Sequence, residues 1–462
     1  MRFKTLLVWH TYHGSVGTIL DSINAIKSCG NLDVVDVDFA ELEGVDVETF
    51  DVVIFHYSVV IAYTSYFSED VRARVKRHPG LKVLFIQDEY RFIDRTARAM
   101  YELGITVVFS LISPNAVRKV YPHPWLDDVR FEHTLTGFVP EDLCRREVPP
   151  YAERPIDVSY RARKLASWMG AHTIQKWLIA ERFPRDVEGR GLTLDISHRE
   201  EDRLYGEAWV NLIANSKAVL GTESGASVCD FSGELQVIVE KYIAEHPDAD
   251  PQEIHDKFVR HLEGNVVMNV ISPRCFEAIA LRTLLIMYQG EYGGVLVPHR
   301  HYVVLEKDHS NIDEVLDVLR DPAKAQAIID RAYEEIAMSG RWTYAAMSRH
   351  LSTIIDEEYA KRPWPAPVVK VTGDPPDGGH EASRLAEEQA RREAAEQAAR
   401  RSFAGSIRHL EKRALARLLH AARDEKTPGI LRAGLYPAIR AYSLARIAVR
   451  GAYLAVKNTP PI

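Results

Sequence analysis

The sequence lacks the signals of several protein classes. It has four cysteines, and no two of them show the spacing of a CxxC or zinc motif. This argues against a disulfide framework and favours a reducing compartment. No uninterrupted apolar stretch approaches a membrane span, and the apolar run Leu6–Trp9 is too short for a signal peptide. We therefore expect a cytoplasmic protein.

A metal-ligand cluster is also missing from the spacing of His, Cys, Asp and Glu, so we expect no metal and no cofactor. The formal net charge of −7 and the charged fraction of 27% are ordinary for a soluble globular protein. A chain of 462 residues is long enough for two or three domains with real cores.

Short apolar segments alternate with helix-like segments through residues 1–150. The strand-like runs include Leu6–Trp9, Val52–Phe55 and Val83–Ile86, and a helix is expected from about Val16 to Lys27. Buried strands separated by helices predict a parallel, doubly wound sheet, whose ligands bind at the carboxyl ends of the strands. The polar residues expected at that edge are His10, His13, Asp88 and Glu89.

A second alternating unit follows a proline-punctuated linker at Val148–Pro155 and extends to residue 362. Its expected strands include Ile156–Tyr160 and Lys217–Leu220, with helices at His172–Glu181 and Ile312–Arg320. The fold class is therefore α/β, with two Rossmann-like doubly wound domains. The basic residues Arg161, Arg163 and Lys164 follow the first strand of this unit, and Glu223 follows its third.

The C-terminal part differs in composition from both units. Residues 363–381 are rich in Pro, Gly and Asp and predict a linker, and residues 382–462 predict a helical, basic extension. From Arg401 onwards there are twelve basic and three acidic residues, so this part carries +9. At helical spacing, residues 437–457 place their basic side chains on one third of the circumference. That pattern indicates contact with an anionic membrane surface, or packing on the enzyme body or a partner subunit.

The stretch Asn269–Ala278 carries a further signal. The apolar run Val266–Ile271 is cut by Ser272 and Pro273, which fit the N-cap and first position of a helix. A strand, tight turn and helix N-terminus would offer backbone N–H groups to a phosphate. Glu277 lies one turn inside that helix, where its carboxylate could accept two sugar hydroxyls. An ordinary helix start with a first-turn acid shows the same pattern.

Together these segments resemble GT-B fold glycosyltransferases, and in particular the CgeB-like branch related to glycosyl transferases group 1. The resemblance spans most of residues 1–355. The segments that carry it, besides Gln87–Tyr90, are Arg154–Tyr160, Gly221–Ser227, Ile271–Ala278 and His301–Asp313.

The resemblance implies a role for each candidate donor-site residue. Glu277 would bind the ribose hydroxyls of a nucleotide, and the backbone around Ser272, Pro273 and Arg274 would receive the diphosphate. Similar enzymes often have a second acid eight residues before the glutamate, and Asn269 stands there in this chain. The other candidate donor ligands are Arg161, Arg163, Lys164 and Glu223.

Since no DxD motif lies in a suitable loop, positive side chains instead of a metal would stabilise the leaving diphosphate. Asp88, Glu89 and His13 are the candidates for the base that accepts the acceptor's proton. We therefore expect a metal-independent glycosyltransferase that moves a sugar from a nucleotide-diphosphate donor to a cell-surface glycan, glycolipid or polysaccharide acceptor.

The expected partners are the nucleotide sugar, a glycan or lipid-linked acceptor, and a membrane surface contacted through residues 437–457 at the inner face of the cell membrane. We expect no nucleic-acid partner. Two alternatives remain: a GT-B-fold sugar-nucleotide epimerase, and a non-catalytic scaffold that binds a membrane or a partner through its C-terminal extension.

Overall fold

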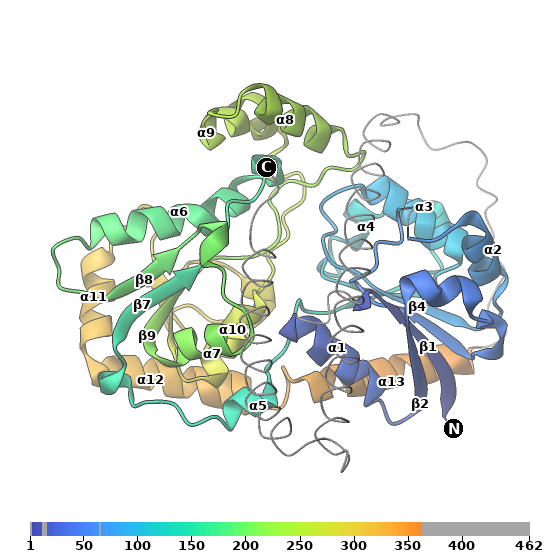
Figure 1. The fold of residues 1–462 in the computed structure, drawn as a ribbon, viewed down its shortest axis with the longest axis horizontal. Coiled ribbons are helices and arrows are strands. Elements are labelled where there is room, and N and C mark those ends of the chain that lie inside the picture. Colours follow the sequence, from blue (N-terminus) through green and yellow to red (C-terminus); the bar gives the residue numbers. More distant parts are fainter. Residues whose placement is uncertain (1, 12–15, 64–65, 362–462) are drawn as a thin grey trace, which may run out of the picture. The chain divides into compact units, whose positions relative to one another are not determined.

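The computed structural model describes residues 2–11, 16–63 and 66–361. All of them belong to one compact unit. They form two parallel sheets, each flanked by helices, which confirms the expected α/β fold with two doubly wound parts (Figure 1). We call the first sheet with its helices the first lobe (residues 2–133 and 344–360). The second sheet with its helices is the second lobe (residues 156–332).

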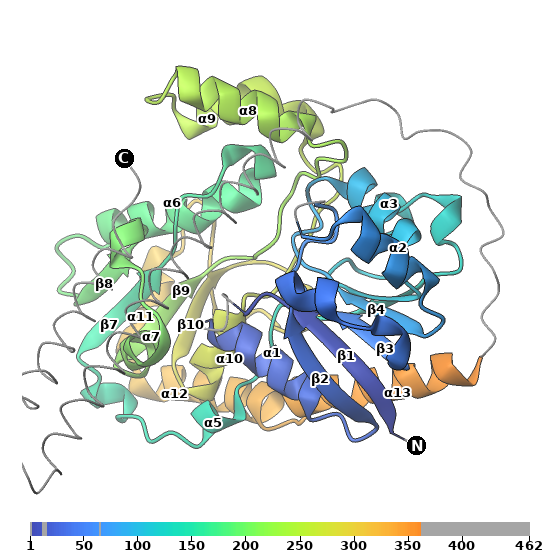
Figure 2. The same cartoon turned by 45° about the vertical axis from the view of Figure 1, so that its right-hand side comes forward.

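Six parallel strands make the sheet of the first lobe, in the order β2-β1-β3-β4-β5-β6. Figure 2 labels β1 to β4 of this sheet. The strand order reverses between β1 and β3, and such a reversal is where doubly wound sheets bind ligands. The strands are β1 (Phe3–Trp9), β2 (Leu32–Asp38), β3 (Val52–Phe55), β4 (Leu81–Phe85), β5 (Val107–Ser110) and β6 (Arg130–His133). Charged residues at both ends of β6 hid this edge strand from the sequence pattern.

Helices cover both faces of this sheet, since its strands are apolar on both sides. The helices are α1 (Gly17–Lys27), α2 (Glu69–Arg77), α3 (Ile93–Leu103), α4 (Val117–Val120) and α13 (Tyr344–Ala360). Although α13 is the last described helix in the sequence, it packs beside α1 on the first sheet (Figure 1). Arg130 fixes it there with ion pairs to Glu357 at 2.7 Å and Glu358 at 2.8 Å. The expected second unit, which extends to residue 362, therefore includes α13, although this helix packs on the first sheet.

The second sheet has the order β11-β10-β9-β7-β8, so its strand order reverses between β7 and β9. Its strands are β7 (Ile156–Arg161), β8 (Leu194–Ser197), β9 (Ser216–Gly221), β10 (Leu284–Tyr288) and β11 (Val303–Leu305). The short helix α5 (Glu141–Cys144) precedes this sheet. The helices of the second lobe are α6 (Ala171–Asp186), α7 (Gly206–Ala214), α10 (Pro273–Ala280), α11 (Ile312–Arg320) and α12 (Pro322–Ala332).

The expected strand at Val266–Ile271 is not part of the sheet. Val270 instead pairs antiparallel with Ser224, with N···O distances of 2.7 and 3.1 Å, and Met268 N–H donates to the Ala226 carbonyl. The side chains of Val266, Met268 and Val270 pack into a core cluster of the first lobe. The apolar run is thus explained by burial against the other lobe and not by a sheet.

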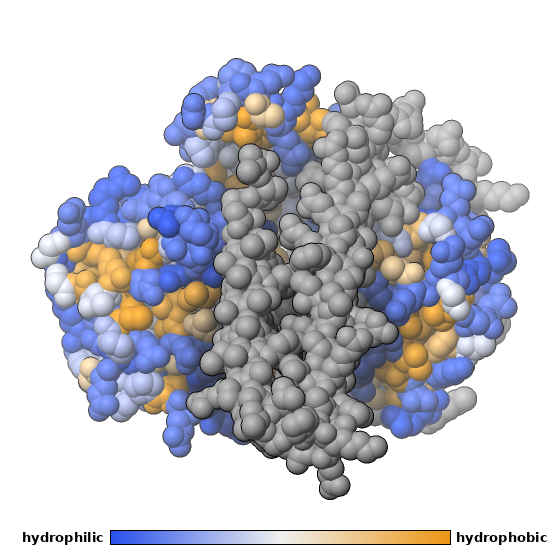
Figure 3. All heavy atoms as spheres, in the orientation of Figure 1, coloured by the Kyte–Doolittle hydropathy of each residue, from blue (hydrophilic) through white to orange (hydrophobic). Residues whose placement is uncertain are grey.

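The segment between β9 and α10 (residues 222–272), which we call the ribbon, carries the helices α8 (Glu234–Glu245) and α9 (Pro251–Ile254). Their buried residues form a small core of their own with Trp168 and Met169. In the space-filling view their outward side is mainly hydrophilic and hydrophobic residues gather at its base (Figure 3). The ribbon also joins the lobes through main-chain bonds: Asp230 N–H donates to the Tyr90 carbonyl at 2.7 Å, and Asp94 N–H to the Phe231 carbonyl at 3.2 Å.

The predicted linker 363–381 and extension 382–462 lie outside the described residues, as does the amphipathic segment 437–457. Among the helices of the described part, none has the length and apolar character needed to cross a membrane.

Candidate functional site

The helix start predicted at Ser272 is confirmed. Ser272 is the N-cap of α10 with extended backbone angles, and Pro273 is its first helical residue. The Ser272 side chain makes no capping hydrogen bond, so the helix end is not closed by its own cap. Pro273 has no N–H to offer, and the first N–H group of the helix is therefore that of Arg274. This end of α10 can receive an anion.

Glu277 and Arg274 lie one turn apart on the same side of α10, together with Trp209 of α7. The Trp209 indole N–H donates to the Glu277 carboxylate at 2.8 Å, and the Arg274 guanidinium lies 5.5 Å from the Trp209 ring centre. Burial raises the pKa of Glu277, whereas Trp209 and Arg274 lower it. One oxygen of this carboxylate is thus bound to the indole, and the other is available to a ligand.

The three basic residues that follow β7 differ in their contacts. Arg161 is committed to the protein: its guanidinium pairs with Asp195 at 2.7 Å and donates to three carbonyl groups. Lys164 pairs with Glu181 at 3.2 Å and lies 4.5 Å from the Trp177 ring centre. The Arg163 side chain is exposed and has no polar partner within the described part of the chain. Of the three, Arg163 is therefore the one that can turn to a ligand.

A fourth basic residue, Lys176, was missed by the sequence reasoning. It lies on α6, and its ammonium group has neither a hydrogen bond nor an ion pair among the residues described. Burial, followed by the nearby charge of Arg274, lowers the pKa of Lys176 to about 8; Arg163 also lowers it, and Asp88 raises it. The available signal was its place in the helix that follows the basic loop after the first strand of the second lobe.

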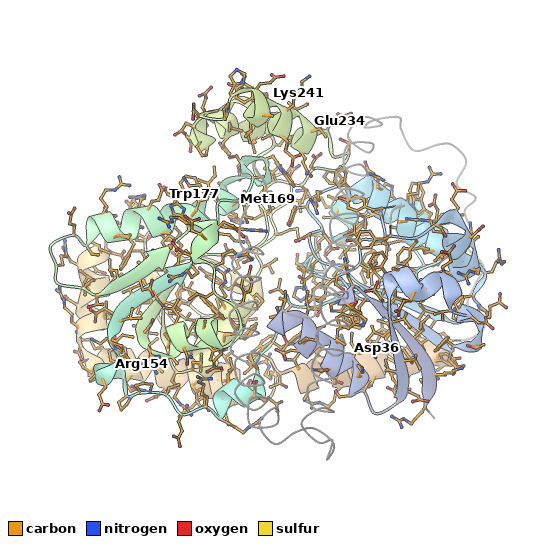
Figure 4. All side chains as sticks on the ribbon, in the orientation of Figure 1. Asp36, Arg154, Met169, Trp177, Glu234 and Lys241 are labelled. Atoms are coloured by element: carbon orange, nitrogen blue, oxygen red, sulfur yellow. The ribbon has the colours of Figure 1, made fainter. Side chains whose placement is uncertain are left out.

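Arg163, Lys176 and Arg274, which we call the basic cluster, come from the loop after β7, from α6 and from the start of α10. Arg274 donates to the Arg161 carbonyl and the Tyr160 hydroxyl donates to the Lys176 carbonyl, so both residues lie beside the carboxyl end of β7, where the strand order reverses. Figure 4 shows Met169 and Trp177 at this end of the lobe and Arg154 at the other. The concentration of three cations suits this edge to a multivalent anion.

Arg154, which contributed to the family resemblance, is a structural residue. Its buried guanidinium donates to Pro149 O at 3.1 Å, Ser216 O at 2.9 Å and Leu281 O at 3.1 Å, and to the Thr283 hydroxyl at 2.7 Å. It therefore fastens the start of the second lobe and cannot reach a ligand at the opposite edge.

Glu223 holds a turn. One of its carboxylate oxygens accepts the N–H groups of Glu291 at 2.7 Å and Tyr292 at 2.9 Å. The other oxygen lies 3.9 Å from the imidazole Nε2 of His172. Burial raises the pKa of Glu223 and lowers that of His172. Glu223 thus has an oxygen left for a ligand, next to an imidazole whose Nδ1 has no hydrogen-bond partner in the described chain.

Asn269 lies in the ribbon that links the Gly221–Ser227 loop to α10. Its carbonyl accepts the Gly293 N–H at 2.9 Å, and its side-chain Oδ1 is buried with no partner among the described residues. A buried acceptor without a donor is costly, so this amide is available to a ligand hydroxyl or a water molecule.

On the first lobe, Asp88 and Glu89 follow β4 but differ in exposure. Asp88 is exposed, has a left-handed backbone with φ of 58°, and accepts the Tyr90 hydroxyl at 2.8 Å. Such strain in a non-glycine residue is typical of functional positions. The Asp88 carboxylate also acts electrostatically on Lys176 of the second lobe. Asp88 therefore faces the basic cluster.

Glu89 is only 2% exposed and is enclosed by donors. It accepts from the Ser110 hydroxyl at 2.8 Å, the Leu111 N–H at 2.8 Å and the Tyr121 hydroxyl at 2.9 Å. Burial raises the pKa of Glu89 to about 7, against the effect of these hydrogen bonds. We assign it a structural role. His13 lies outside the described residues.

Within the described residues, no group of three His, Cys, Asp or Glu side chains is placed to hold a metal ion. Comparison with known proteins gave no match to a family model and no match to a curated protein sequence.

Solved structures do resemble this chain. An α-glucosyltransferase in complex with UDP-glucose and DNA containing an abasic site is 10% identical, covering 77% of this chain and 100% of its own, with a TM-score of 0.44. A DNA-modifying β-glucosyltransferase is 13% identical, covering 76% and 99%, with a TM-score of 0.44. HepE of Anabaena in complex with UDP is 10% identical, covering 77% and 100%, with a TM-score of 0.46. Because these TM-scores lie below 0.5, no residue role in this chain rests on them.

The expectation of no nucleic-acid partner needs correction, since the structures found include an α-glucosyltransferase in complex with DNA and a DNA-modifying β-glucosyltransferase. Total charge is a poor guide to such partners: the net −7 of this chain averages over patches of both signs, and binding to phosphates depends on the local basic surface.

Proposed function

We propose that this protein is a glycosyltransferase that binds a nucleotide-diphosphate sugar at the carboxyl edge of the second sheet. The observation that carries the proposal is the basic cluster of Arg163, Lys176 and Arg274 beside the uncapped start of α10. Three cations and a helix N-terminus at a point of strand-order reversal suit a diphosphate. Glu277, one turn into α10, would then accept the ribose hydroxyls.

The chemistry follows from this placement. An acceptor hydroxyl attacks the anomeric carbon of the donor sugar, and the bond from that carbon to the diphosphate oxygen breaks. The hydroxyl proton passes to Asp88, and the negative charge left on the diphosphate is stabilised by the basic cluster. We propose that the side chains supply this stabilisation without a metal ion. Residues Asn269 and Glu223, each with an oxygen left to accept, would contact the donor.

Several finer points belong to the same proposal. The acceptor is a cell-surface glycan, a glycolipid or a polysaccharide intermediate, and the protein works in the cytoplasm, held at the inner membrane face through residues 437–457. The relationship to the CgeB-like branch rests on the sequence segments alone.

Calorimetric titration of the full-length protein with UDP, GDP and dTDP tests the nucleotide site. We expect one of them to bind, and Glu277→Ala to weaken that binding about tenfold, as expected for loss of hydrogen bonds to a charged group. If none of the three binds, the donor-site assignment is wrong. A product assay with the nucleotide sugar alone separates transfer from epimerisation: an epimerase would form an epimer with no acceptor present.

A further inference from the structure

The loop that carries the proposed base, residues 88–94, has a strained backbone in two places. Asp88 and Phe92 are left-handed, with φ of 58° and 50°, although neither is a glycine. Residues in this conformation persist only where the surrounding structure holds them. Glu89 anchors the loop on one side, because its carboxylate is enclosed by donors in the first lobe. The anchor on the other side comes from the ribbon of the second lobe.

The ribbon lies along this loop and packs on it at several points. Main-chain hydrogen bonds join the two at Tyr90 and Asp94. Beyond them, Gly233 lies so close to the Phe92 ring that a Cβ atom at position 233 would stand 2.1 Å from it. Gly233 also has a φ of 92°, which a residue with a side chain rarely adopts. Only glycine fits at this position, so the ribbon packs directly on the second strained residue of the loop.

Asp230 holds the ribbon in the conformation that makes these contacts. The residue is only 5% exposed. One of its carboxylate oxygens accepts the Gly233 N–H and the other accepts the Gln236 N–H, each at 2.9 Å. Its own main-chain N–H donates to the Tyr90 carbonyl at 2.7 Å. A single residue therefore closes the turn before α8 and binds the loop of the first lobe.

Tyr90 connects this contact to the proposed base. Its ring packs against the core cluster of the first lobe and against that of the ribbon, with the Trp168 ring centre 6.0 Å away. Its hydroxyl donates to Oδ1 of Asp88 at 2.8 Å. A hydrogen bond to one oxygen restricts rotation of the carboxylate and leaves Oδ2 of Asp88 to take a proton.

The ribbon continues from this contact to the proposed donor site. Its last residue, Ser272, is the N-cap of α10, and Val270 pairs with Ser224 at the beginning of the ribbon. One segment of the chain therefore contacts both the loop of the base and the helix that would receive the diphosphate. The placement of the base relative to the donor thus depends on the ribbon.

We propose that Tyr90 and Asp230 are positioning residues of the transfer reaction. Tyr90 orients the Asp88 carboxylate through its hydroxyl, and Asp230 holds the loop of Tyr90 in place from the ribbon. The acceptor's proton passes to Oδ2 of Asp88, while the Tyr90 hydroxyl keeps its own proton. The inference rests on the proposed function and adds to it the residues that orient its base.

Tyr90→Phe is the decisive variant because it removes the hydroxyl and keeps the ring. Tyr242→Phe is the matched control, since Tyr242 lies on α8 of the same ribbon and donates its hydroxyl to a different carboxylate, that of Glu253, at 3.0 Å. Asp230→Ala removes both acceptors of the turn, whereas Asp230→Asn keeps one of them. Tyr90→Phe is also combined with Asp88→Asn, so that a double-mutant cycle shows whether Tyr90 acts through Asp88.

The full-length protein is assayed with UDP-glucose as donor and with water or methyl β-glucopyranoside as acceptor. UDP release at increasing donor concentration gives kcat and KM, calorimetry gives the UDP affinity, and thermal unfolding gives Tm. If calorimetry selects GDP or dTDP, the corresponding glucose donor takes the place of UDP-glucose.

We expect Tyr90→Phe to lower kcat about tenfold, the effect of one hydrogen bond to a charged group, with KM and UDP affinity unchanged. Tyr242→Phe should leave kcat unchanged. Asp230→Ala should lower kcat by at least as much as Tyr90→Phe, and Asp230→Asn should lower it less. In the Asp88→Asn protein, Tyr90→Phe should cost no further activity.

Two results would overturn the inference: a kcat that Tyr90→Phe leaves unchanged, or an equal loss of kcat when Tyr90→Phe is added to the unaltered protein and to Asp88→Asn. A loss of kcat in Asp230→Ala that Asp230→Asn repeats in full would remove Asp230 from the proposal. In each of these cases the unaltered protein still turns over its donor, so the inference fails alone. If no nucleotide binds, or the unaltered protein releases none from its donor, the proposed function fails and the inference fails with it.

Discussion

The two lobes share one topology but present different chemistry at corresponding places. In both sheets the strand order reverses beside the first strand, between β1 and β3 in one and between β7 and β9 in the other. At the second reversal three cations gather at a helix start, whereas the carboxyl edge of the first sheet is lined there by hydroxyls, an amide and aromatic rings. The shared backbone fixes where ligands bind, and the side chains decide which ligand each edge receives.

Asp88 stands at the first edge but faces the charges of the second, so its loss tests whether the two edges act together. Asp88→Asn should lower the transfer rate by about 10²- to 10⁴-fold because the acceptor's proton loses its base, while nucleotide affinity changes little. Product formation under saturating donor measures the rate. Glu89→Gln is the matched control; an equal loss of rate in that variant would show that the adjacent, enclosed carboxylate carries the chemistry.

Lys176 tests the charge of the second edge. Lys176→Met should weaken nucleotide-diphosphate binding roughly 10- to 100-fold, since a hydrogen bond between charged groups is lost. Calorimetry at constant ionic strength checks this. Lys324→Met serves as control because Lys324 is exposed on α12 and its ammonium group pairs, among the described residues, with Asp321 alone, at 3.8 Å. Equal affinities of both variants and the unaltered protein would remove Lys176 from the site.

The protonation state of Lys176 gives a second test of the charge at the second edge. Burial lowers the pKa of Lys176 to about 8, below its unfolded value of 10.5. In the absence of ligand the ammonium is therefore lost above pH 8, and nucleotide affinity should fall by up to about tenfold from pH 7.5 to 9.5. Lys176→Arg should flatten that profile, since guanidinium stays charged. An affinity for nucleotide that stays constant over this pH range would contradict a role for the Lys176 ammonium.

The smallest expected effect is that of Glu89→Gln on the pH dependence of stability. Burial raises its pKa from 4.5 to about 7. Between these values the folded protein binds more protons than the unfolded chain, so its contribution to stability falls as pH rises through that window. Glu89→Gln should remove this dependence, because the hydroxyls of Ser110 and Tyr121 can reverse to accept from the amide. We expect Tm of the unaltered protein to drop about 4 °C more between pH 5 and 8 than Tm of the variant.

The regular elements followed from the sequence because their apolar periodicity reflects burial within one sheet. Val52–Phe55 and Ile312–Arg320 begin and end at the expected residues. Periodicity does not report which partner buries a segment. The apolar run Val266–Ile271 was therefore predicted to be a strand of the second lobe, although it packs on the first. For the same reason the sequence could not assign α13 to the first sheet.

The candidate site was predicted where a residue's role depends on backbone position, as for Ser272 and Pro273 at the start of α10. It was not predictable where the role depends on which contacts are already made. Arg161 and Arg163 read alike in the sequence, yet the first is bound to Asp195 and the second has no polar partner in the described chain. Lys176 lacked a motif altogether, and only its nearness to Arg274 and Arg163 in the folded chain identifies it.

Hydrogen–deuterium exchange of the full-length protein with and without nucleotide tests the central claim most directly. We expect UDP, or whichever of GDP and dTDP binds more tightly, to protect peptides covering residues 161–176 and 271–277 and to leave the exchange of residues 134–138 unchanged. Protection confined to the first lobe, with the second lobe exchanging as in the free protein, would contradict it.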